Sequence, residues 1–334
     1  MKKLATIFAV LALLMLASIA SADNNGQTVA NDDIVKNTST VIANAVVGRI
    51  AQVVSPAPKP VNTSSLDANG NFKFALNAQD LGIASGGAAD TIGIWGLGAY
   101  TNFKSTASGA RYDADAYNIF LGVDWRATSD LLIGLAGGWG SLDLDKKWGN
   151  NGYIRTDDEL TIMPYAAYNF TDDLIADAAF AYSNGEYKDN DGTNTGKYTS
   201  DRYMTNVGLS YYYLIDQWTL SARAGYMYVQ GNLGSYSRGG VDVANPDSWL
   251  SQANLQAKAA YLFANGFEPY AALKYMVDLQ TSSIPVGSDY DEFEGSLGLN
   301  WNIDNWVLNV EGGMSMGRDE FEAYRGQFYV RYEF

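Results

Sequence analysis

The sequence of 334 residues contains no cysteine and no histidine. Without cysteine the chain has no disulfide bridges and no attachment site for a lipid at its N-terminus. Without histidine and cysteine, neither a Ser-His-Asp triad nor a Cys-His pair can be built, and a zinc site would depend on carboxylates alone. The sequence therefore predicts a protein that is not an enzyme, with no catalytic residues, no cofactor and no metal site.

Basic charge and long apolar runs are also scarce. The net charge is −15 at pH 7, and this argues against nucleic acid as a partner because phosphate binding requires a basic surface. After the N-terminal segment, no stretch approaches the ~18 uninterrupted apolar residues of a membrane-spanning helix. Any later passage through a membrane must therefore use another kind of structure.

The first segment, residues 1–22, is predicted to be a secretory signal peptide. Lys2 and Lys3 form its charged start, an apolar run extends from Leu4 to Ile19, and Ala-Ser-Ala forms a small-residue cleavage site. A membrane anchor is the alternative, but the apolar run is short for one. We expect the mature chain to begin at Asp23.

Residues 23–90 are predicted to contain a short helix and a linker. The helix is expected at Asp32–Val54, where apolar side chains recur at helical spacing. The sequence "SPAPKP" of residues 55–60 would end it. The apolar stripe fits a charged lumen poorly, but the opposite face carries polar side chains that could pair with acids in a pore: Lys36, Asn37, Thr40, Asn44 and Arg49.

From Thr91 onward the chain alternates between apolar and polar residues. In "YNIFLGVDW", Tyr117 to Trp125, every second residue is apolar, which is the period of a β-strand. A soluble sandwich would place the apolar face inside, whereas a membrane barrel places it outside. Long strands, aromatic residues at both ends of the apolar faces, and small or charged residues opposite them favour the membrane barrel.

The predicted fold is therefore all-β: a twelve-stranded antiparallel transmembrane β-barrel at residues 91–334, with a short N-terminal helix. Five short turns would place both chain ends of the barrel on the periplasmic side, and the longer connections would face outward. Phe334 then ends the last strand at the periplasmic interface. The strands are expected at residues 91–103, 112–126, 131–145, 153–168, 173–187, 198–214, 217–230, 248–263, 267–280, 290–302, 305–317 and 321–334.

Several segments resemble the autotransporter β-domain family of Gram-negative outer membranes. They are "YDADAYNIFLGVDWRATSDLLIGLAGGWGSLDLD" (112–145), "IMPYAAYNF" (162–170), "EPYAAL" (268–273) and "FYVRYEF" (328–334). The resemblance implies a twelve-stranded barrel with a helix near or through the pore, inserted by the outer-membrane assembly machinery. It also implies a C-terminal assembly signal at Phe328, Val330, Tyr332 and Phe334. Family members usually carry a long passenger before the barrel, whereas here only residues 23–90 precede it.

Strand register predicts which charged side chains face the lumen. Both signs occur among them, so they could surround an inserted segment or line a narrow pore. The acids Asp177, Asp278, Glu294 and Glu311 are expected partners for the polar face of the helix. The complete predicted set is Asp124, Asp177, Arg223, Lys258, Lys274, Asp278, Glu294, Glu311, Arg325 and Arg331.

Acidic residues also gather near the predicted outer rim. Carboxylates favour Ca²⁺ or Mg²⁺, which could bridge the rim to lipopolysaccharide phosphates. The simpler interpretation is that charge keeps surface loops solvated, and we favour it. The residues are Asp157, Asp158, Glu159, Asp189, Asp191, Asp289, Asp291 and Glu292.

Two functions remain open from the sequence. The first is an autotransporter-like, surface-exposed membrane protein or minimal translocator with a vestigial passenger, in the outer membrane of a Gram-negative bacterium. The second is a small porin-like channel for solutes. The expected partners are outer-membrane lipids and lipopolysaccharide, the assembly machinery and periplasmic chaperones.

Overall fold

The computed structural model describes residues 26–54, 92–282, 289–303 and 305–334; the predicted signal peptide and the whole predicted linker, residues 55–90, lie outside these ranges. One helix, α2 (Gly26–Val54), occurs in the described part of the chain. The strands there are β1 (Ile92–Ser105), β2 (Tyr112–Arg126), β3 (Leu131–Lys146), β4 (Tyr153–Asn169), β5 (Leu174–Asn190), β6 (Thr195–Ile215), β7 (Trp218–Leu233), β8 (Tyr236–Arg238), β9 (Val241–Val243), β10 (Ser248–Tyr261), β11 (Phe267–Thr281), β12 (Asp291–Ile303), β13 (Trp306–Met316) and β14 (Phe321–Glu333).

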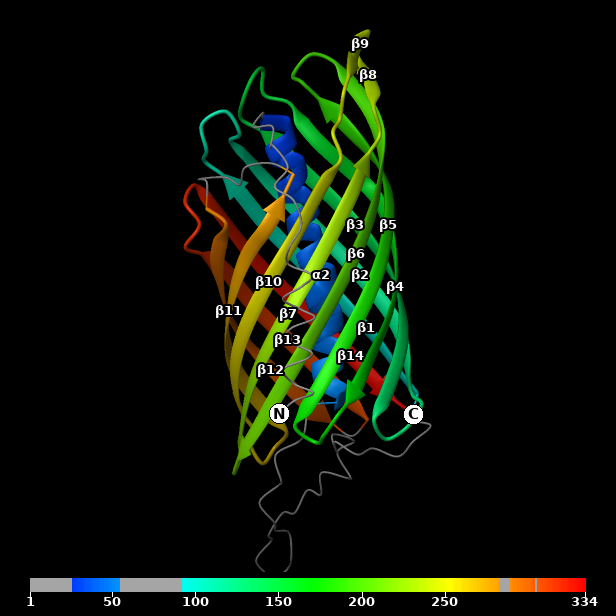
Figure 1. Ribbon diagram of the computed structural model, residues 1–334, viewed down its shortest axis with the longest axis vertical. Helices are drawn as coiled ribbons and strands as arrows, with labels where there is room; N and C mark the ends of the chain where they lie inside the picture. The colour runs from blue at the N-terminus through cyan, green and yellow to red at the C-terminus, as the bar shows by residue number, and fades with distance from the viewer. Residues whose placement is uncertain (1–25, 55–91, 283–288, 304) are drawn as a thin grey trace, which may run out of the picture.

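Twelve of the described strands close into one antiparallel barrel (Figure 1). Each strand pairs with its neighbour in sequence, except that β7 pairs with β10 and that β1 closes the ring by pairing with β14. The small strands β8 and β9 form a separate hairpin. The predicted fold, a twelve-stranded barrel with an N-terminal helix, is confirmed.

The alternation of the sequence determines which way each side chain faces. Along β2, Leu121 is 69% exposed on the outer wall, whereas its neighbour Phe120 is buried inside. Leu297 on β12 is likewise 71% exposed. The apolar side chains on the outer wall suit contact with lipid. Closure of the barrel also leaves no strand edge with unpaired backbone groups in the bilayer.

Pairs of aromatic rings mark both ends of the apolar outer band. Trp306 and Tyr332 lie together near the short turns, with ring centroids 4.8 Å apart. Tyr182 and Tyr203 lie together nearer the long connections, with centroids 5.2 Å apart. Rings of this kind settle at the two membrane interfaces, so they define a periplasmic and an outer end of the barrel.

Glycines of β2 and β3 make room for aromatic rings inside the barrel. A Cβ atom on Gly134 would lie 2.1 Å from the ring of Tyr165, and one on Gly122 would lie 2.4 Å from the ring of Trp95. By contrast, a Cβ on the outward-facing Gly98 would meet nothing within 4 Å. The inward glycines therefore act as slots for rings on neighbouring strands.

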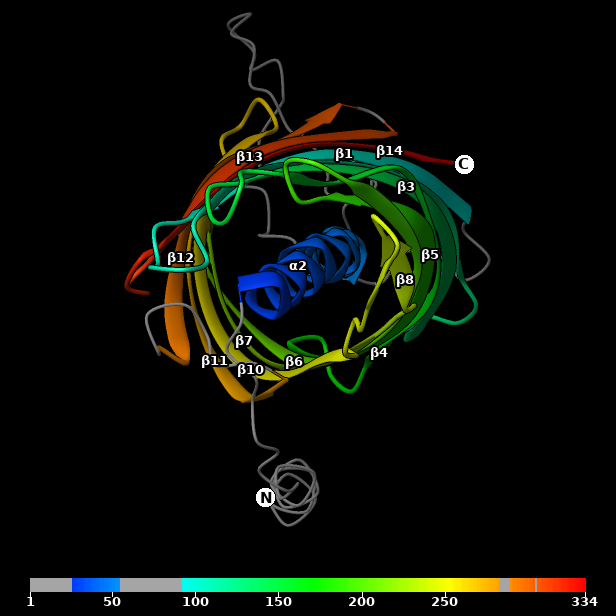
Figure 2. The ribbon, with the colours of Figure 1, turned by 90° about the horizontal axis from the view of Figure 1, so that it is seen from above.

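The β5–β6 hairpin reaches further outward than the sequence analysis predicted. β5 continues to Asn190 and β6 begins at Thr195, so the connection between them is a tight turn. In this turn the backbone N–H groups of Asn194 and Thr193 donate to the carboxylate of Asp191, and these bonds lower its pKa. The β8–β9 hairpin folds inward over the mouth at the same end (Figure 2).

In the part of the chain that the structure describes, no helix has the length and apolarity needed to cross a bilayer.

Candidate functional site

The candidate site is the lumen of the barrel, which contains α2. The helix runs along the barrel axis with its N-terminal end among the long outer connections and its C-terminal end near the short turns (Figures 1 and 2). It begins at Gly26 rather than at the predicted Asp32. The reason is that Asp32 and Asp33 accept hydrogen bonds from side chains of the barrel instead of capping the helix.

The apolar stripe of α2 packs on an apolar part of the barrel wall. Val46, Ile42 and Ile50 belong to one buried cluster that includes wall residues of β1 to β7. Among these wall residues are Leu97, Phe120, Leu132, Ala136, Met163, Ala167, Ile175 and Ala179. The expectation that this stripe fits the lumen poorly was therefore wrong, because the lumen is charged on only part of its circumference.

A second buried cluster closes the outer end of the lumen. Val29, Ala30 and Ile34 of the helix join aromatic residues of the wall there. The wall and hairpin contribute Phe103, Tyr112, Tyr187, Tyr198, Tyr236 and Phe321, with aliphatic residues between them. Since water is excluded from such a cluster, the outer mouth is sealed by side chains as well as by the helix.

Charged groups fix the outer half of the helix. Lys36 Nζ lies 2.9 Å from Asp278 Oδ2 and 2.8 Å from Glu292 Oε1, and all three side chains are buried. Tyr112 donates a 2.6 Å hydrogen bond to Asp33 Oδ2. These contacts join the helix to β2, β11 and β12, on opposite sides of the barrel.

Arg318, in the connection between β13 and β14, lies 4.0 Å from Asp33. Burial works to lower the pKa of Arg318, but the carboxylates of Asp33, Glu292 and Asp278 outweigh it and raise the pKa above its ordinary value. The guanidinium therefore remains charged beside the outer half of the helix.

A buried network fixes the inner half of the helix. Arg49, which is 0% exposed, makes two hydrogen bonds to the carboxylate of Asp124 on β2. Tyr165 donates to the same carboxylate at 3.0 Å, and Trp95 Nε1 donates to the Tyr165 hydroxyl at 2.7 Å. The helix is thereby joined to β1, β2 and β4 near the periplasmic end.

The C-terminal turn of α2 receives a donor from the wall. Arg126 Nη2 donates a 2.7 Å hydrogen bond to the carbonyl oxygen of Val53. The last carbonyls of a helix have no partner within it, and they carry the negative end of its dipole. A guanidinium at this position donates the hydrogen bond that the carbonyl lacks and places a positive charge beside the negative end of the helix dipole.

Two carboxylates hold the β8–β9 hairpin over the mouth: Asp189, and Asp191, whose Oδ2 lies 3.2 Å from Arg238 Nε. Asp189 accepts hydrogen bonds from Lys146, Tyr236 and Arg238, which come from β3 and the hairpin. The ring of Tyr236 also packs against that of Tyr198, with centroids 5.2 Å apart. Sequence analysis did not identify this hairpin or its contacts.

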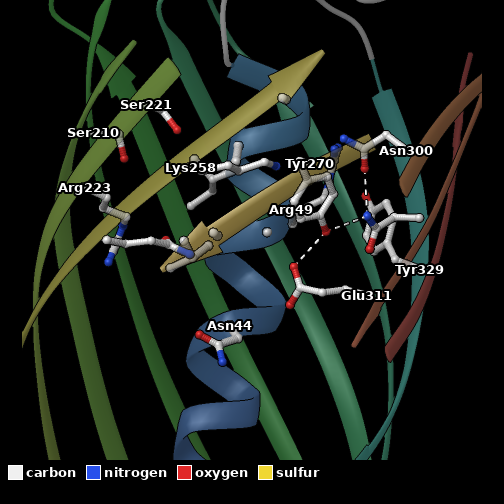
Figure 3. Close-up of a pocket in the computed structure, with 18 of the residues that line it drawn as sticks. Asn44, Arg49, Ser210, Ser221, Arg223, Lys258, Tyr270, Asn300, Glu311 and Tyr329 are labelled. Atoms are coloured by element: carbon white, nitrogen blue, oxygen red, sulfur yellow. Dashed lines mark hydrogen bonds between the residues drawn. The ribbon is translucent and has the colours of Figure 1, made fainter. Parts of the chain in front are cut away.

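A cavity lined by both polar and apolar side chains remains in the periplasmic half, between the helix and the strands from β5 to β14. Its volume is about 150 Å³. Figure 3 shows Asn44 of the helix and Lys258, Tyr270 and Glu311 of the wall around it. Tyr270 donates a 2.7 Å hydrogen bond to Glu311, and Lys258 Nζ lies 3.7 Å from the Tyr270 ring centroid.

The ten predicted lumen charges all occupy inward-facing positions in the structure. Asp124, Asp177, Arg223, Lys274, Asp278, Glu294 and Arg331 are buried, whereas Lys258, Glu311 and Arg325 border the cavity. Asp278 pairs with Lys36 of the helix, as expected. The other three expected acids pair within the wall, Asp177 with Arg223 and both Glu294 and Glu311 with Arg325, because those cations lie closer than the helix.

Three acids assigned to the outer rim face inward instead. Glu159 pairs with Arg202, Asp189 with Lys146, and Glu292 with Lys36. In the described ranges, no group of three or more acidic side chains is arranged to hold a metal ion. The register of Glu159 was missed because β4 is irregular between Arg155 and Leu160, and counting by two fails across such an irregularity.

Three residues of the predicted assembly signal, Phe328, Val330 and Tyr332, lie on the outer wall of β14, and the fourth, Phe334, directly follows the strand. Phe328 is 49% and Phe334 is 71% exposed, while Tyr329 and Arg331 between them are buried inside. Strand β14 closes the barrel against β1, with Gly98 opposite Phe328. At this position the outward side chains would be accessible before β14 pairs with β1 and the barrel closes. Recognition of these side chains by the assembly machinery stays a prediction.

The comparisons with known proteins agree with this architecture. The model of the autotransporter beta-domain matches residues 94–317. The translocator domain of the autotransporter NalP from Neisseria meningitidis is similar with a TM-score of 0.64 at 10% identity, over 72% of this chain and 88% of that one. No curated protein matches the chain.

Two further solved structures share the fold. The beta domain of the Bordetella autotransporter BrkA has a TM-score of 0.61 at 17% identity, over 73% of this chain and 100% of that one. The transport unit of the autotransporter AIDA-I from Escherichia coli has a TM-score of 0.55 at 13% identity, over 93% and 100%. The protein is thus located in the outer membrane of a Gram-negative bacterium, and the chain belongs to the autotransporter β-domain family.

Proposed function

We propose that this protein is a non-enzymatic, surface-exposed outer-membrane barrel whose pore is closed by its own N-terminal helix. The observation that carries the proposal is the position of α2 along the whole lumen, with buried charged contacts at Lys36 and Arg49. The apolar cluster at the outer mouth adds a second barrier to ions. In this state the barrel occupies the membrane without conducting.

The composition supports a role without catalysis. The chain lacks histidine and cysteine, so it cannot form the usual activated nucleophiles. Several lumen carboxylates are held in ion pairs, among them Asp124 and Asp177. A carboxylate whose oxygens already accept hydrogen bonds from a buried guanidinium is not free to contact a substrate.

The direction of the helix supports a vestigial passenger. The N-terminal end of α2 lies among the outer connections of the barrel (Figure 1), so a segment fused before the helix would be directed toward the cell surface. A minimal translocator would then carry a fused N-terminal segment to the surface, and protease added to intact cells would remove that segment.

The alternative function, a small solute channel, has one observation in its favour. The cavity of about 150 Å³ beside Lys258 and Tyr270 has charged and polar side chains in its lining and belongs to the periplasmic half. A channel would require the helix to leave or the outer cluster to open. The closed barrel and the channel therefore differ in the conductance of the complete protein.

Planar-bilayer recording tests the proposal. Deletion of residues 23–60 should raise the conductance markedly while assembly is unchanged, because the lumen loses its only described helix. Assembly is checked by the different migration of unheated and boiled samples on a denaturing gel. If the complete and truncated barrels conduct alike, the helix is not a plug and the proposal fails.

A further inference from the structure

Three cations form a row on the outer wall, where it extends beyond the membrane. Arg155 on β4 lies directly opposite Lys188 on β5, and Lys188 lies directly opposite Lys197 on β6. Their neighbours Ile154, Tyr187 and Tyr198 are buried inside, so the three charged side chains point outward. Adjacent strands are about 4.8 Å apart, and like charges directly opposite each other destabilise a sheet.

The cations of this row have acidic neighbours that balance them only weakly. Arg155 lies 2.6 Å from Asp143 through Nε and 3.5 Å from Asp145 through Nη2, and Lys197 Nζ lies 2.8 Å from Glu186. Lys188 Nζ lies 3.2 Å from Asp157. All these side chains are substantially exposed, and exposed ion pairs are readily replaced by other ions.

The height of the row limits what can reach it. Lys188 follows Tyr182 by six residues, and Lys197 precedes Tyr203 by six, where the two tyrosines mark the outer interface. With a rise of about 3.3 Å per residue and a tilt of about 40°, the row lies roughly 15 Å beyond that interface. A glycerophospholipid carries its phosphate at the interface itself, so its charge lies too low.

The surroundings of the row suit a sugar. The next residues outward on the same face are Tyr153, Asn190 and Thr195, which are in register with one another. They carry hydroxyl and amide groups, and Asn190 donates a 2.9 Å hydrogen bond to Thr195. Such uncharged donors and acceptors bind sugar hydroxyls, while the cations below bind phosphates or carboxylates attached to the sugars.

We infer that the row of Arg155, Lys188 and Lys197 binds the anionic sugar core of lipopolysaccharide in the outer leaflet. This lipid combines an acyl anchor at the membrane with phosphates and carboxylates on sugars outside it. The three side chains project from regular strands, parallel to the membrane plane, and not from a loop that points away from the membrane. It therefore meets a lipid neighbour more readily than a soluble polyanion.

Binding to the purified, folded barrel in detergent tests this inference. The probes are a deep-rough lipopolysaccharide that retains its inner-core sugars, lipid A, which lacks the core sugars, and phosphatidylglycerol. The complete protein should bind the core-bearing lipid most tightly. The variant R155Q/K188Q/K197Q should lose about tenfold in affinity for it, and added salt should reduce the difference by screening.

Two matched variants separate this site from a general charge effect. K104Q/R111Q/K147Q removes three other outer cations and should bind as the unmodified protein does. D143N/D145N/D157N/E186Q frees the row from its acids and should bind more tightly. Equal losses in both cation variants, equal binding of lipid A and core-bearing lipid, or equally tight binding of soluble heparin would each overturn the inference.

Discussion

Lys36 offers the sharpest test of how the helix is held. Lys36→Met keeps the length of the side chain but leaves Asp278 and Glu292 without the ammonium that both now contact. Both carboxylate oxygens lie within 3 Å of one nitrogen, so they are at most ~6 Å apart. Two unit charges at that separation repel by about 3 kcal/mol at an effective dielectric constant of about 20.

This repulsion should loosen the outer half of α2. A cost of about 3 kcal/mol corresponds to roughly a hundredfold increase in the undocked population. Arg318 remains nearby and keeps the cost at the lower end of the ~3–5 kcal/mol typical of broken buried pairs. In planar bilayers, Lys36→Met should therefore show transient openings that the unmodified protein lacks.

Two controls decide whether charge is the cause. The variant K36M/D278N/E292Q removes the repulsion and should be quiet again. Lys258→Met removes a lumen lysine that contacts Tyr270 and has no ion pair among the described residues, so it should not change the recordings. The reasoning is refuted if Lys36→Met is as quiet as the unmodified protein, or if the triple variant opens as often as Lys36→Met.

Three other changes probe the cap, the glycine slots and the C-terminus. Arg126→Ala removes the donor to the last turn of α2 and should lower the free energy of unfolding in urea by about 1.5–3 kcal/mol; an unchanged transition would show that the contact is not formed. Gly134→Ala should destabilise the barrel by about 1–3 kcal/mol because its Cβ meets an aromatic ring, whereas Gly98→Ala, which meets nothing, should not shift the melting temperature. Deletion of Phe334 should reduce the amount of heat-modifiable barrel in the membrane much more than Glu333→Ala does, and equal amounts would contradict the predicted assembly signal.

The barrel was predictable because its alternation is regular over long stretches. From Tyr117 to Trp125 every second residue had to face lipid, and a shift by one residue would have reversed the whole strand. The short turns then fixed the number and direction of the strands. The approximate position of the helix followed from its apolar spacing, although its first turns did not.

The contacts inside the barrel could not be predicted in the same way. Register predicted that Asp124 faces inward, but not that Arg49 lies opposite it, because the depth and rotation of the helix are not encoded in strand alternation. The small β8–β9 hairpin also lacked a signal, since three-residue strands carry too few alternations to recognise. Such contacts depend on packing between segments that are distant in the sequence.

The two flanks of residues 55–91 have a consequence for how tightly α2 must bind. Val53 contacts Arg126 at the periplasmic end of β2, and Ile92 pairs with Trp125 at that same end. The helix is therefore a ligand tethered to its own receptor, at an effective concentration on the order of millimolar or above. This explains how a Val- and Ile-rich sequence of low helical propensity can fill the lumen, since the partner is always present. The same segment supplied as a free peptide should occupy an emptied barrel only at comparably high concentration.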